Sequence, residues 1–350
     1  MRRVPAAFAA SLLTCALVAA PTIACGGLIG PNGAVNLLRT TTFVGYHEGI
    51  EHYVTAFAFA GGGGAFGSIT PLPGVPTSVD KGGDWTLQRL IRETDPPAPS
   101  VLFEAEDVAR PESGVQVLLQ TSIDALDITV LKGGGDAVGA WATDHGFRLP
   151  PDAPEVLDFY AQRSPIFLAA SFNADAAQAR GQAIGDGTPV HITIPTSDPW
   201  VPLRILSLGK SADDRVDADV FLLTDRAPTL LPAATGDGLF LDHTAPASTA
   251  LLDDLRSDRG MDWVPDSGWL MKVRVDSRAA DLHYDLAVDA TGRGLASRVA
   301  AGLDMPAAPD VPAPPAEGSL LMLGLGLVVA GGAGVGVLSR RGRITQPPGA

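Results

Sequence analysis

An uncharged segment near the C-terminus limits the architectures open to this chain: Ser319 to Leu338 are twenty consecutive residues without a charged side chain. A helix rises about 1.5 Å per residue, so this length matches the roughly 30 Å apolar thickness of a bilayer. The segment contains six glycines, each of which would cost about 1 kcal/mol in a buried soluble helix. The sequence therefore predicts one transmembrane helix over 319–338, and the cell membrane as a partner.

Charged residues at the two ends give this span an orientation. Arg340, Arg341 and Arg343 follow it directly, and positive charge beside a span is retained in the cytoplasm. At the other end, Met1-Arg2-Arg3 and an apolar run over 6–20 are typical of a secretory signal peptide. We expect a single-pass protein of the cell membrane with a signal peptide over 1–24, a cytoplasmic tail over 339–350 and the rest outside the cytoplasm.

The expected signal cleavage lies between Ala24 and Cys25. Thr22-Ile23-Ala24-Cys25 resembles a lipobox, so Cys25 is also a candidate for lipidation, with ordinary cleavage beside a plain cysteine as the alternative. Cys15 leaves with the signal peptide, which leaves one cysteine in the mature chain. An intramolecular disulfide is then impossible, and packing alone must hold the fold together.

The exported part is strongly acidic. Five of the 25 Lys and Arg residues lie outside residues 25–318 and none of the 39 Asp and Glu residues does, which leaves 20 basic against 39 acidic side chains. A net charge of about minus 19 repels nucleic acid, so nucleic-acid recognition is excluded as an expected function. Five prolines between 306 and 315 predict a stiff spacer over 306–318. The ectodomain then covers 25–305, with a division into two subdomains near 225–235 left open.

Hydrophobic patterning predicts an α+β ectodomain of mostly antiparallel strands with a few short helices. Two β runs separated by Tyr46 to Gly49 predict a hairpin, and an acidic turn is expected over Asp213 to Asp219. Asp152 is placed to cap the helix that starts at Ala153. The expected helices cover 85–91, 136–145, 153–163 and 249–256, and the expected strands cover 37–44, 52–59, 65–70, 101–108, 115–121, 126–131, 166–172, 190–194, 203–208, 220–223, 270–275 and 282–288.

Several stretches resemble a known bacterial family, domain of unknown function 2330. They are Ala24-Cys25-Gly26-Gly27, the hairpin leading into Phe66-Gly67-Ser68-Ile69-Thr70-Pro71-Leu72-Pro73, Leu87-Gln88-Arg89-Leu90, the block from Ala137 to Pro150, the helix 153–163, Phe167-Leu168-Ala169 and Pro202-Leu203-Arg204-Ile205. The resemblance covers about residues 24–225, and Trp141-x-x-x-x-Gly146-Phe147-x-Leu149-Pro150 is its most specific element. It implies a secreted or membrane-anchored α+β protein without an assigned activity.

The sequence departs from this family at two places. A second cysteine often follows Cys-Gly-Gly in the family, whereas Leu28, Ile29 and Gly30 stand here, and Ser68 occupies a position that is often aromatic. A disulfide of the relatives therefore does not carry over, and a pocket built around that aromatic residue is in doubt.

Two groups of side chains are candidates for binding a metal. His47 and His52 flank the expected hairpin turn, where a shared zinc ion competes with the simpler interpretation of a polar hairpin tip. Asp213 and Asp217 carry the hard oxygen ligands that calcium prefers, but the glycine and terminal glutamate of a twelve-residue calcium loop are missing. The sequence specifies no cofactor, with calcium and zinc as the two open options.

No residue is assigned a catalytic role, because the sequence contains no Gly-x-Ser-x-Gly elbow, phosphate loop or dinucleotide fingerprint. We expect a cell-surface binding or structural module with an unidentified protein or envelope partner. The alternative is a cell-envelope hydrolase, metal-dependent or not, whose groups among His47, Glu48, His52, Asp144 and His145 converge only in three dimensions. A concave pocket with two titratable groups would favour the hydrolase, and an exposed apolar or aromatic patch the binding module.

Overall fold

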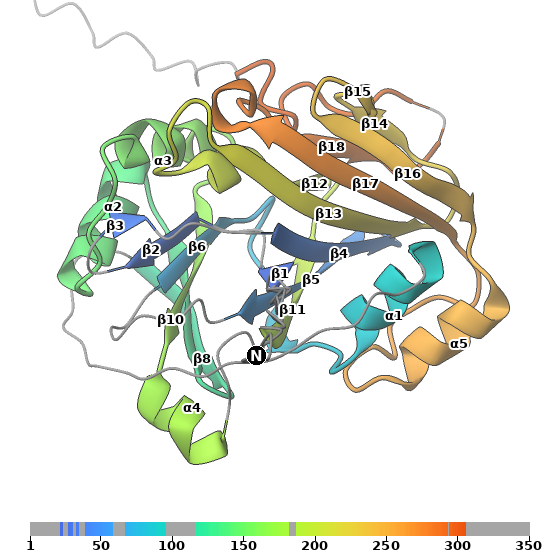
Figure 1. Ribbon diagram of the computed structural model, residues 1–350, viewed down its shortest axis with the longest axis horizontal. Coiled ribbons are helices and arrows are strands. Elements are labelled where there is room, and N and C mark those ends of the chain that lie inside the picture. Colours follow the sequence, from blue (N-terminus) through green and yellow to red (C-terminus); the bar gives the residue numbers. More distant parts are fainter. Residues whose placement is uncertain are drawn as a thin grey trace, which may run out of the picture. The chain divides into compact units, whose positions relative to one another are not determined.

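The computed structural model describes residues 22–23, 27–30, 33–34, 39–58, 67–95, 116–181, 187–292 and 294–305. All of them belong to one compact unit, residues 1–306. Within this unit the chain forms a large sheet, a six-stranded sheet and a three-stranded sheet, together with short helices (Figure 1).

The large sheet contains nine strands, and it is antiparallel except where β4 pairs with β13 and with β1. Its short strand β1 (Thr22–Ile23) pairs beside the start of β4, so cleavage after Ala24 would remove β1. The other strands follow in the order β15 (Thr235–Gly236), β16 (Leu239–Pro246), β17 (Trp269–Arg278), β13 (Arg215–Thr224), β4 (Arg39–His47), β5 (Ile50–Ala58), β11 (Gly187–Pro195) and β7 (Ser78–Lys81).

The two smaller sheets are antiparallel throughout. The six-stranded sheet has the order β3 (Gly33–Ala34), β2 (Gly27–Gly30), β6 (Gly67–Pro71), β10 (Ile166–Phe172), β9 (Leu126–Lys132) and β8 (Gln116–Ile123). The three-stranded sheet has the order β12 (Trp200–Val201), β18 (Leu286–Asp289) and β14 (Thr229–Leu231).

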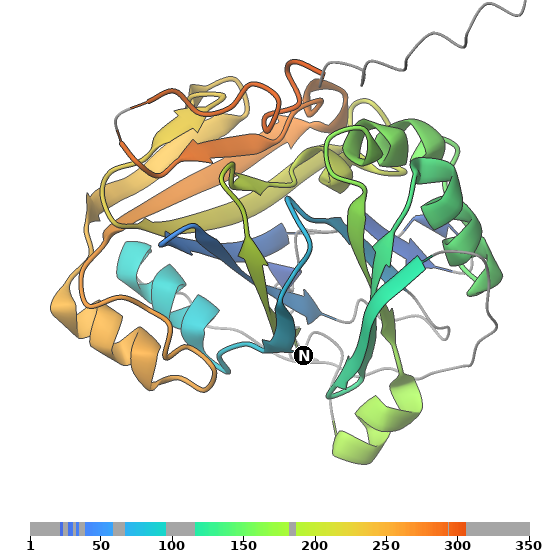
Figure 2. The same cartoon turned by 180° about the vertical axis from the view of Figure 1, so that it is seen from behind.

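Helices cover the sheets in two groups, as Figures 1 and 2 show from opposite sides. One pair, α2 and α3, packs on the six-stranded sheet, and the other pair, α1 and α5, packs on the large sheet. The helical elements are α1 (Thr86–Thr94), α2 (Gly135–Asp144), α3 (Ala153–Ala161), α4 (Ala174–Arg180), α5 (Thr249–Ser257) and the 3-10 turns η1 (Arg204–Ser207) and η2 (Ala279–Asp281).

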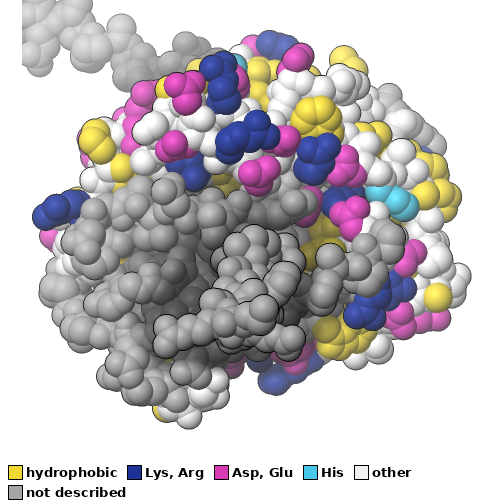
Figure 3. All heavy atoms as spheres, viewed as in Figure 1, with side chains coloured by type: hydrophobic (Ala, Val, Ile, Leu, Met, Phe, Trp, Pro, Cys, Tyr) yellow, Lys and Arg dark blue, Asp and Glu magenta, His cyan; other side chains and the backbone are white. Residues whose placement is uncertain are grey.

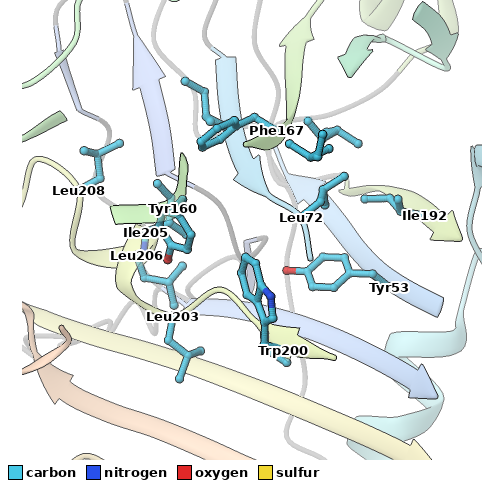
Figure 4. Packing of buried hydrophobic residues seen from close by; sticks show 14 of the residues in the cluster. Tyr53, Leu72, Tyr160, Phe167, Ile192, Trp200, Leu203, Ile205, Leu206 and Leu208 are labelled. Carbon is cyan, nitrogen blue, oxygen red and sulfur yellow. Dashed lines mark hydrogen bonds between the residues drawn. The ribbon is translucent and has the colours of Figure 1, made fainter. Parts of the chain in front are cut away.

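Two hydrophobic clusters hold these layers together. The larger one includes Tyr53 of β5, Ile192 of β11 and Phe167 of β10, so it joins the large sheet to the six-stranded sheet (Figure 4). The smaller one lies on the other face of the large sheet, where Phe43 and Phe221 pack under α1 and α5. Because strand side chains alternate between faces, β4 and β5 contribute to both clusters.

The predicted α+β fold with mostly antiparallel strands is confirmed, and so is the first hairpin. His47 pairs with Ile50 across a two-residue turn, and both turn residues have positive φ, 51° at Glu48 and 80° at Gly49. Positive φ at both central positions is the geometry that matches the twist of the flanking strands, and Gly adopts it without strain. The turn is therefore shorter than the four residues expected from the sequence.

Three local predictions are wrong. In each case, the backbone or side chain forms hydrogen bonds with a group that is distant in the sequence. Residues 203–208 form the 3-10 turn η1 instead of a strand, since Leu203 N and Arg204 N donate to Asp285 Oδ1 at 2.7 and 3.0 Å. Asp152 accepts from Gly209 N at 2.9 Å and makes no cap contact with α3. The acidic turn ends early, because the residues from Arg215 onward pair with β17 as part of β13.

Several predictions fall outside the described residues. These are most of the signal peptide, the cleavage site and Cys25, the loop 61–64, the strand 101–108, the spacer 306–318, the span 319–338 and the tail 339–350. Among the residues that the structure does describe, no helix combines the length and apolarity needed to cross a membrane. The division near 225–235 stays a prediction.

Acidic and basic side chains alternate over the displayed surface (Figure 3). Pairs such as Arg274–Asp242 and Arg278–Asp281 have nitrogen–oxygen distances of 2.9 and 2.8 Å. Such exposed pairs contribute little to stability, but they neutralise part of the acidic surface locally.

Candidate functional site

Four neighbouring strands bring polar side chains from distant parts of the sequence onto one face of the large sheet. The register aligns His52 of β5 with Thr193 of β11, which in turn faces Ser78 of β7. Two residues along, His191 of β11 faces Asp80 of β7. Residues directly opposite in paired strands share a face. We call this set, together with His47 at the end of β4, the histidine face: His47, His52, Ser78, Asp80, His191 and Thr193.

The two inner histidines of this face contact each other directly. His52 Nδ1 and His191 Nε2 are 2.9 Å apart, so one ring donates its N–H and the other accepts. The distance between the ring centroids is 5.1 Å, which exceeds the distance between the two nitrogens by 2.2 Å. This difference is about the width of one imidazole ring, as expected when both nitrogens lie between the two centroids. The rings therefore meet end to end, with the two nitrogens pointing at each other.

Trp263 packs against this pair from the segment that follows α5. Its ring lies parallel to His52, with centroids 4.0 Å apart and planes within 1°, and its centroid is 5.4 Å from that of His191. The tryptophan fits because Gly45 lies beneath it, where a Cβ atom would come within 2.3 Å of Trp263 Cζ3. Trp263 Nε1 is buried without a hydrogen-bond partner among the described residues.

Burial keeps the histidine pair neutral at pH 7. It lowers the pKa of His52 to about 4, with smaller contributions from the charges of His191 and His47. It also lowers the pKa of His191 to about 4, although the nearby carboxylates of Asp80 and Asp262 act in the opposite direction. A neutral pair presents one donor and one acceptor nitrogen on its outer sides, whichever ring donates in the middle.

Glu51, the neighbour of His52 in sequence, points to the opposite face of the sheet. Its side chain is completely buried, and burial raises the pKa of this carboxyl to about 8. Glu51 Oε2 accepts from Trp200 N at 3.3 Å, while Oε1 has no partner among the residues that the structure describes. The carboxyl is therefore mostly protonated at pH 7.

A second buried carboxyl group lies between α3 and the three-stranded sheet. Asp285 is fully buried, and its carboxylate receives hydrogen bonds from Arg163 Nη2 at 2.5 Å and Tyr160 Oη at 2.8 Å. Arg163 also donates to Ala300 O at 2.6 Å and lies 4.1 Å above the ring of Phe159. The contacts satisfy both partners, so this centre is structural.

The candidate residues identified from the sequence lie at different places in the structure. His47 and His52 share the histidine face, but His47 Nδ1 donates to Asp225 Oδ1 at 2.6 Å rather than contacting His52. His145 lies at the end of α2 on the six-stranded sheet, where its Nδ1 donates to Trp141 O at 2.7 Å and its ring stacks on Trp141. Asp144 is exposed beside it, and Glu48 is exposed in the hairpin turn.

The two aspartates proposed for calcium lie in different elements. Asp213 precedes β13 and faces Arg278 at 3.5 Å, whereas Asp217 lies within β13. Across the described part of the chain, no three or more His, Cys, Asp or Glu side chains are grouped so that they could hold a metal ion.

A hollow between α2, β6 and β10 is formed by the most specific block of the sequence. Trp141 and Phe147 are its walls, and Gly67 beneath them leaves the space that the Phe147 ring occupies. Its volume is about 10 Å³, which is room for one water molecule. None of its lining residues is titratable, so this hollow is a packing feature between the helix and the sheet.

Sequence reasoning missed His191, Thr193 and Trp263. The first two alternate with the apolar residues Val190, Ile192 and Ile194, a period-two pattern that placed them on the opposite face of a predicted strand. Nothing local connected that face with His52, which is 139 positions away in the sequence. The pair depends on β5 and β11 being neighbours.

A family model for an uncharacterized protein conserved in bacteria, DUF2330, matches residues 19–227. The chain belongs to the DUF2330 family. The resemblance drawn from the sequence is thus confirmed. The DUF2330 match contains all six residues of the histidine face, whereas Trp263 and Asp285 lie beyond it.

Similarity to other known proteins is limited to structure. No curated protein matches the sequence. Over 72% of the DUF2330 chain, a crystal structure of a mutated baculovirus P35 after caspase cleavage is similar, with 7% identity, a TM-score of 0.38 and 99% of that chain covered. The structure of the caspase-8/P35 complex is similar over the same share, with 7% identity, a TM-score of 0.37 and 96% of that chain covered.

Proposed function

We propose that this DUF2330 protein is a membrane-anchored extracytoplasmic binding module whose contact surface is the histidine face. The observation that carries the proposal is the neutral, end-to-end histidine pair beside the surface residues Asp80 and Asp262. The outer nitrogens of two neutral imidazoles in such a pair are one donor and one acceptor, the groups that a polar ligand needs. Most of the fold's stability comes from apolar burial, so a cluster of this kind is not needed for the core.

The contacts of Ala300 and Ala301, near the end of the described residues, support a tether. Arg163 holds Ala300 O at 2.6 Å, and Asp285 N donates to Ala301 O at 3.0 Å, so the last described residues are fastened to the core. The chain then continues into the proline-rich spacer and the uncharged segment 319–338. Tension on a membrane anchor would thus be transmitted to the buried ion pair of Arg163 and Asp285.

Side-chain geometry favours binding over hydrolysis on this face. Ser78 Oγ donates to Thr193 Oγ1 at 3.2 Å, so the hydroxyl that lies in the same row as His52 is directed to another hydroxyl. Activation of a serine requires its Oγ to face the histidine that takes its proton. The contacts of the face fit ligand recognition better than nucleophilic attack.

Two measurements on cells that produce the full chain test this proposal. The first is the fate of the body when protease is added outside intact cells or spheroplasts. We expect digestion of the body and recovery of the chain in the membrane fraction, while a variant ending at residue 318 is released in soluble form. Complete protection, or unprocessed chain free in the cytosol, would contradict the tether.

The second measurement is histidine modification by diethyl pyrocarbonate, read by mass spectrometry in cells and on the purified chain. If the histidine face is covered by an envelope ligand, His47 and His52 are modified more slowly in cells than in the purified chain. His283 is exposed elsewhere and serves as the control, since its relative rate should not change. Equal slowing of all three histidines would argue against a ligand on this face.

A further inference from the structure

The contact between His52 and His191 has the geometry of a linear two-ligand site. Their facing nitrogens are 2.9 Å apart and the ring centroids 5.1 Å apart, with 26° between the ring planes, so the two lone-pair directions run nearly along one line. A chelate with tetrahedral or square geometry needs nitrogen lone pairs that converge on a point beside that line. A line between two nitrogens suits an ion that takes two ligands opposite each other.

We infer that the histidine pair is a two-coordinate site for a monovalent d10 cation, Cu(I), for which Ag(I) is an analogue. Imidazole nitrogen is an accepted copper ligand. The cation takes the place of the proton that the two rings share. The donating ring changes tautomer, its proton passing through solvent from the bridging nitrogen to the outer one, so no net proton is released and no electron is transferred.

Binding requires only a small displacement. Two metal–imidazole bonds of about 2 Å placed end to end need ~4 Å between the nitrogens, about 1 Å more than in the proton-bridged pair. His191 is 7% exposed and firmly packed, whereas His52 is half-buried. We therefore assign the movement to His52, whose ring would slide along the parallel face of Trp263.

Three neighbouring groups offset the burial that disfavours positive charge on this pair. Trp263 lies beside both rings, at 4.0 and 5.4 Å between centroids, and the face of an indole attracts positive charge. Asp80 faces His191 across the strand pair, and Asp262 precedes Trp263; both are exposed. Carboxylates at the rim of a site raise the local concentration of cations.

The same geometry predicts selectivity. Zn²⁺ in proteins takes four ligands in tetrahedral geometry, and no third His, Cys, Asp or Glu of the described residues is grouped with the pair for that purpose. Two opposed imidazoles alone satisfy a linear d10 cation. We expect Zn²⁺ at equal concentration not to displace Ag(I).

This inference rests on the proposed binding role of the histidine face, and it names the ligand class. The test uses the full purified chain in detergent after its thiols have been alkylated, because Cys25 would bind the same cations. Ag(I) is titrated against Trp fluorescence, and Cu(I) is delivered anaerobically from its bicinchoninate complex. We expect one equivalent bound, at least tenfold more weakly in His191→Gln, and unchanged affinity in the control His283→Gln.

A variant that fails to fold does not end the test. Copper K-edge absorption on the wild-type chain should show two nitrogen ligands and no sulfur, whichever variants survive. Four ligands, no stoichiometric binding, or full affinity in a folded His191→Gln chain would overturn the inference. The readout is made on purified protein, so a failed tether in cells and a failed cation site are distinguishable outcomes.

Discussion

Gly45 decides whether Trp263 can reach the histidine pair. The edge of the indole occupies the space where a Cβ atom of residue 45 would lie, and the indole packs against the rings of Phe43 and His52. Any side chain at this position would have to push the ring away. A glycine in the middle of a strand weakens it, so its presence in β4 is explained by this close approach.

Gly45→Ala should therefore destabilise the protein. A Cβ atom 2.3 Å from Trp263 Cζ3 forces the loop after α5 outward, and we expect a loss of about 1–3 kcal/mol in the free energy of unfolding. Urea unfolding followed by Trp fluorescence measures it. Gly134→Ala is the matched control, because nothing lies within 4 Å of its Cβ position. Gly134 is the N-cap residue of α2, so this substitution should lower the free energy of unfolding by less than about 1 kcal/mol. Equal stability of the two variants would contradict this packing.

The buried ion pair of Arg163 and Asp285 gives a second prediction at this scale. Removing the carboxylate in Asp285→Ala leaves the guanidinium and the donors Leu203 N and Tyr160 Oη without their acceptor. We expect a loss of about 3–5 kcal/mol, because a buried charge then has no counterpart. Chemical denaturation measures it.

The exposed pair Arg298–Asp304 supplies the control for that variant. Its nitrogen–oxygen distance is 2.7 Å, so the geometry is comparable while the burial is not. Asp304→Ala should leave the denaturation midpoint nearly unchanged, since water screens an exposed pair. If both variants behaved alike, burial of Asp285 would not be what makes its contacts important.

At the level of elements, side-chain contacts join α1 to α5: Arg89 of α1 bonds Asp254 of α5 at 2.8 Å, and Asp258 makes three further hydrogen bonds. Asp258 at the end of α5 accepts from Asp84 N and Trp85 N at 3.0 and 2.9 Å and from Thr86 Oγ1 at 2.8 Å. These donors belong to the start of α1, whose own N-cap residue makes no side-chain contact. The end of one helix therefore caps the beginning of another.

Asp258→Ala should loosen α1 selectively. Loss of three hydrogen bonds to a carboxylate is expected to cost about 2–3 kcal/mol, and amide exchange should accelerate throughout α1. Ser248→Ala removes the ordinary cap of α5, a bond of 3.2 Å to Leu251 N, and should cost about 1 kcal/mol without changing exchange in α1. Faster exchange of α1 in both variants would mean that the link is not specific.

Elements defined by their own sequence were predicted well. The hairpin of β4 and β5 depends on Gly49, α2 stops two residues before Gly146, whose φ is 84°, and α3 has Pro154 in its first turn. Elements defined by a distant partner were not. The sequence of η1 predicts a strand, but its backbone N–H groups donate to Asp285 instead. The sequence also predicts Asp152 as a helix cap, but its carboxylate accepts from Gly209 N.

For the whole molecule, His52, His191 and Glu51 impose opposing trends on how stability depends on pH. Burial lowers the pKa of His52 and of His191 to about 4 in the folded protein. Their contribution to the free energy of unfolding is therefore fully present above the unfolded pKa of 6.5, and it is lost as pH falls through about 4. The pKa of Glu51 is raised to about 8, so its contribution is present below the unfolded value of 4.5 and is lost as pH rises through about 8. These groups together predict greatest stability near pH 6.5.

Glu51→Gln should remove the loss on the alkaline side. The variant gains stability relative to the wild type on the order of 1.4 kcal/mol for each pH unit between 6.5 and 8. Unfolding free energies measured at half-unit steps from pH 4 to 9 give both curves, and His191→Gln should instead flatten the acid side. Parallel curves for wild type and Glu51→Gln would show that Glu51 does not titrate in this range.

The amino-acid sequence determined the features that depend on neighbours along the chain: an α+β fold, its first hairpin, several helices and membership in a bacterial family. It also singled out His47 and His52, which lie on one face of the large sheet without contacting each other. The pairing of His52 with His191, their contact with Trp263 and the burial of Glu51 were decided by tertiary structure. These residues lie far apart in the chain, and only the order of strands in the large sheet and the removal of water between its layers bring them together and shift their pKa values.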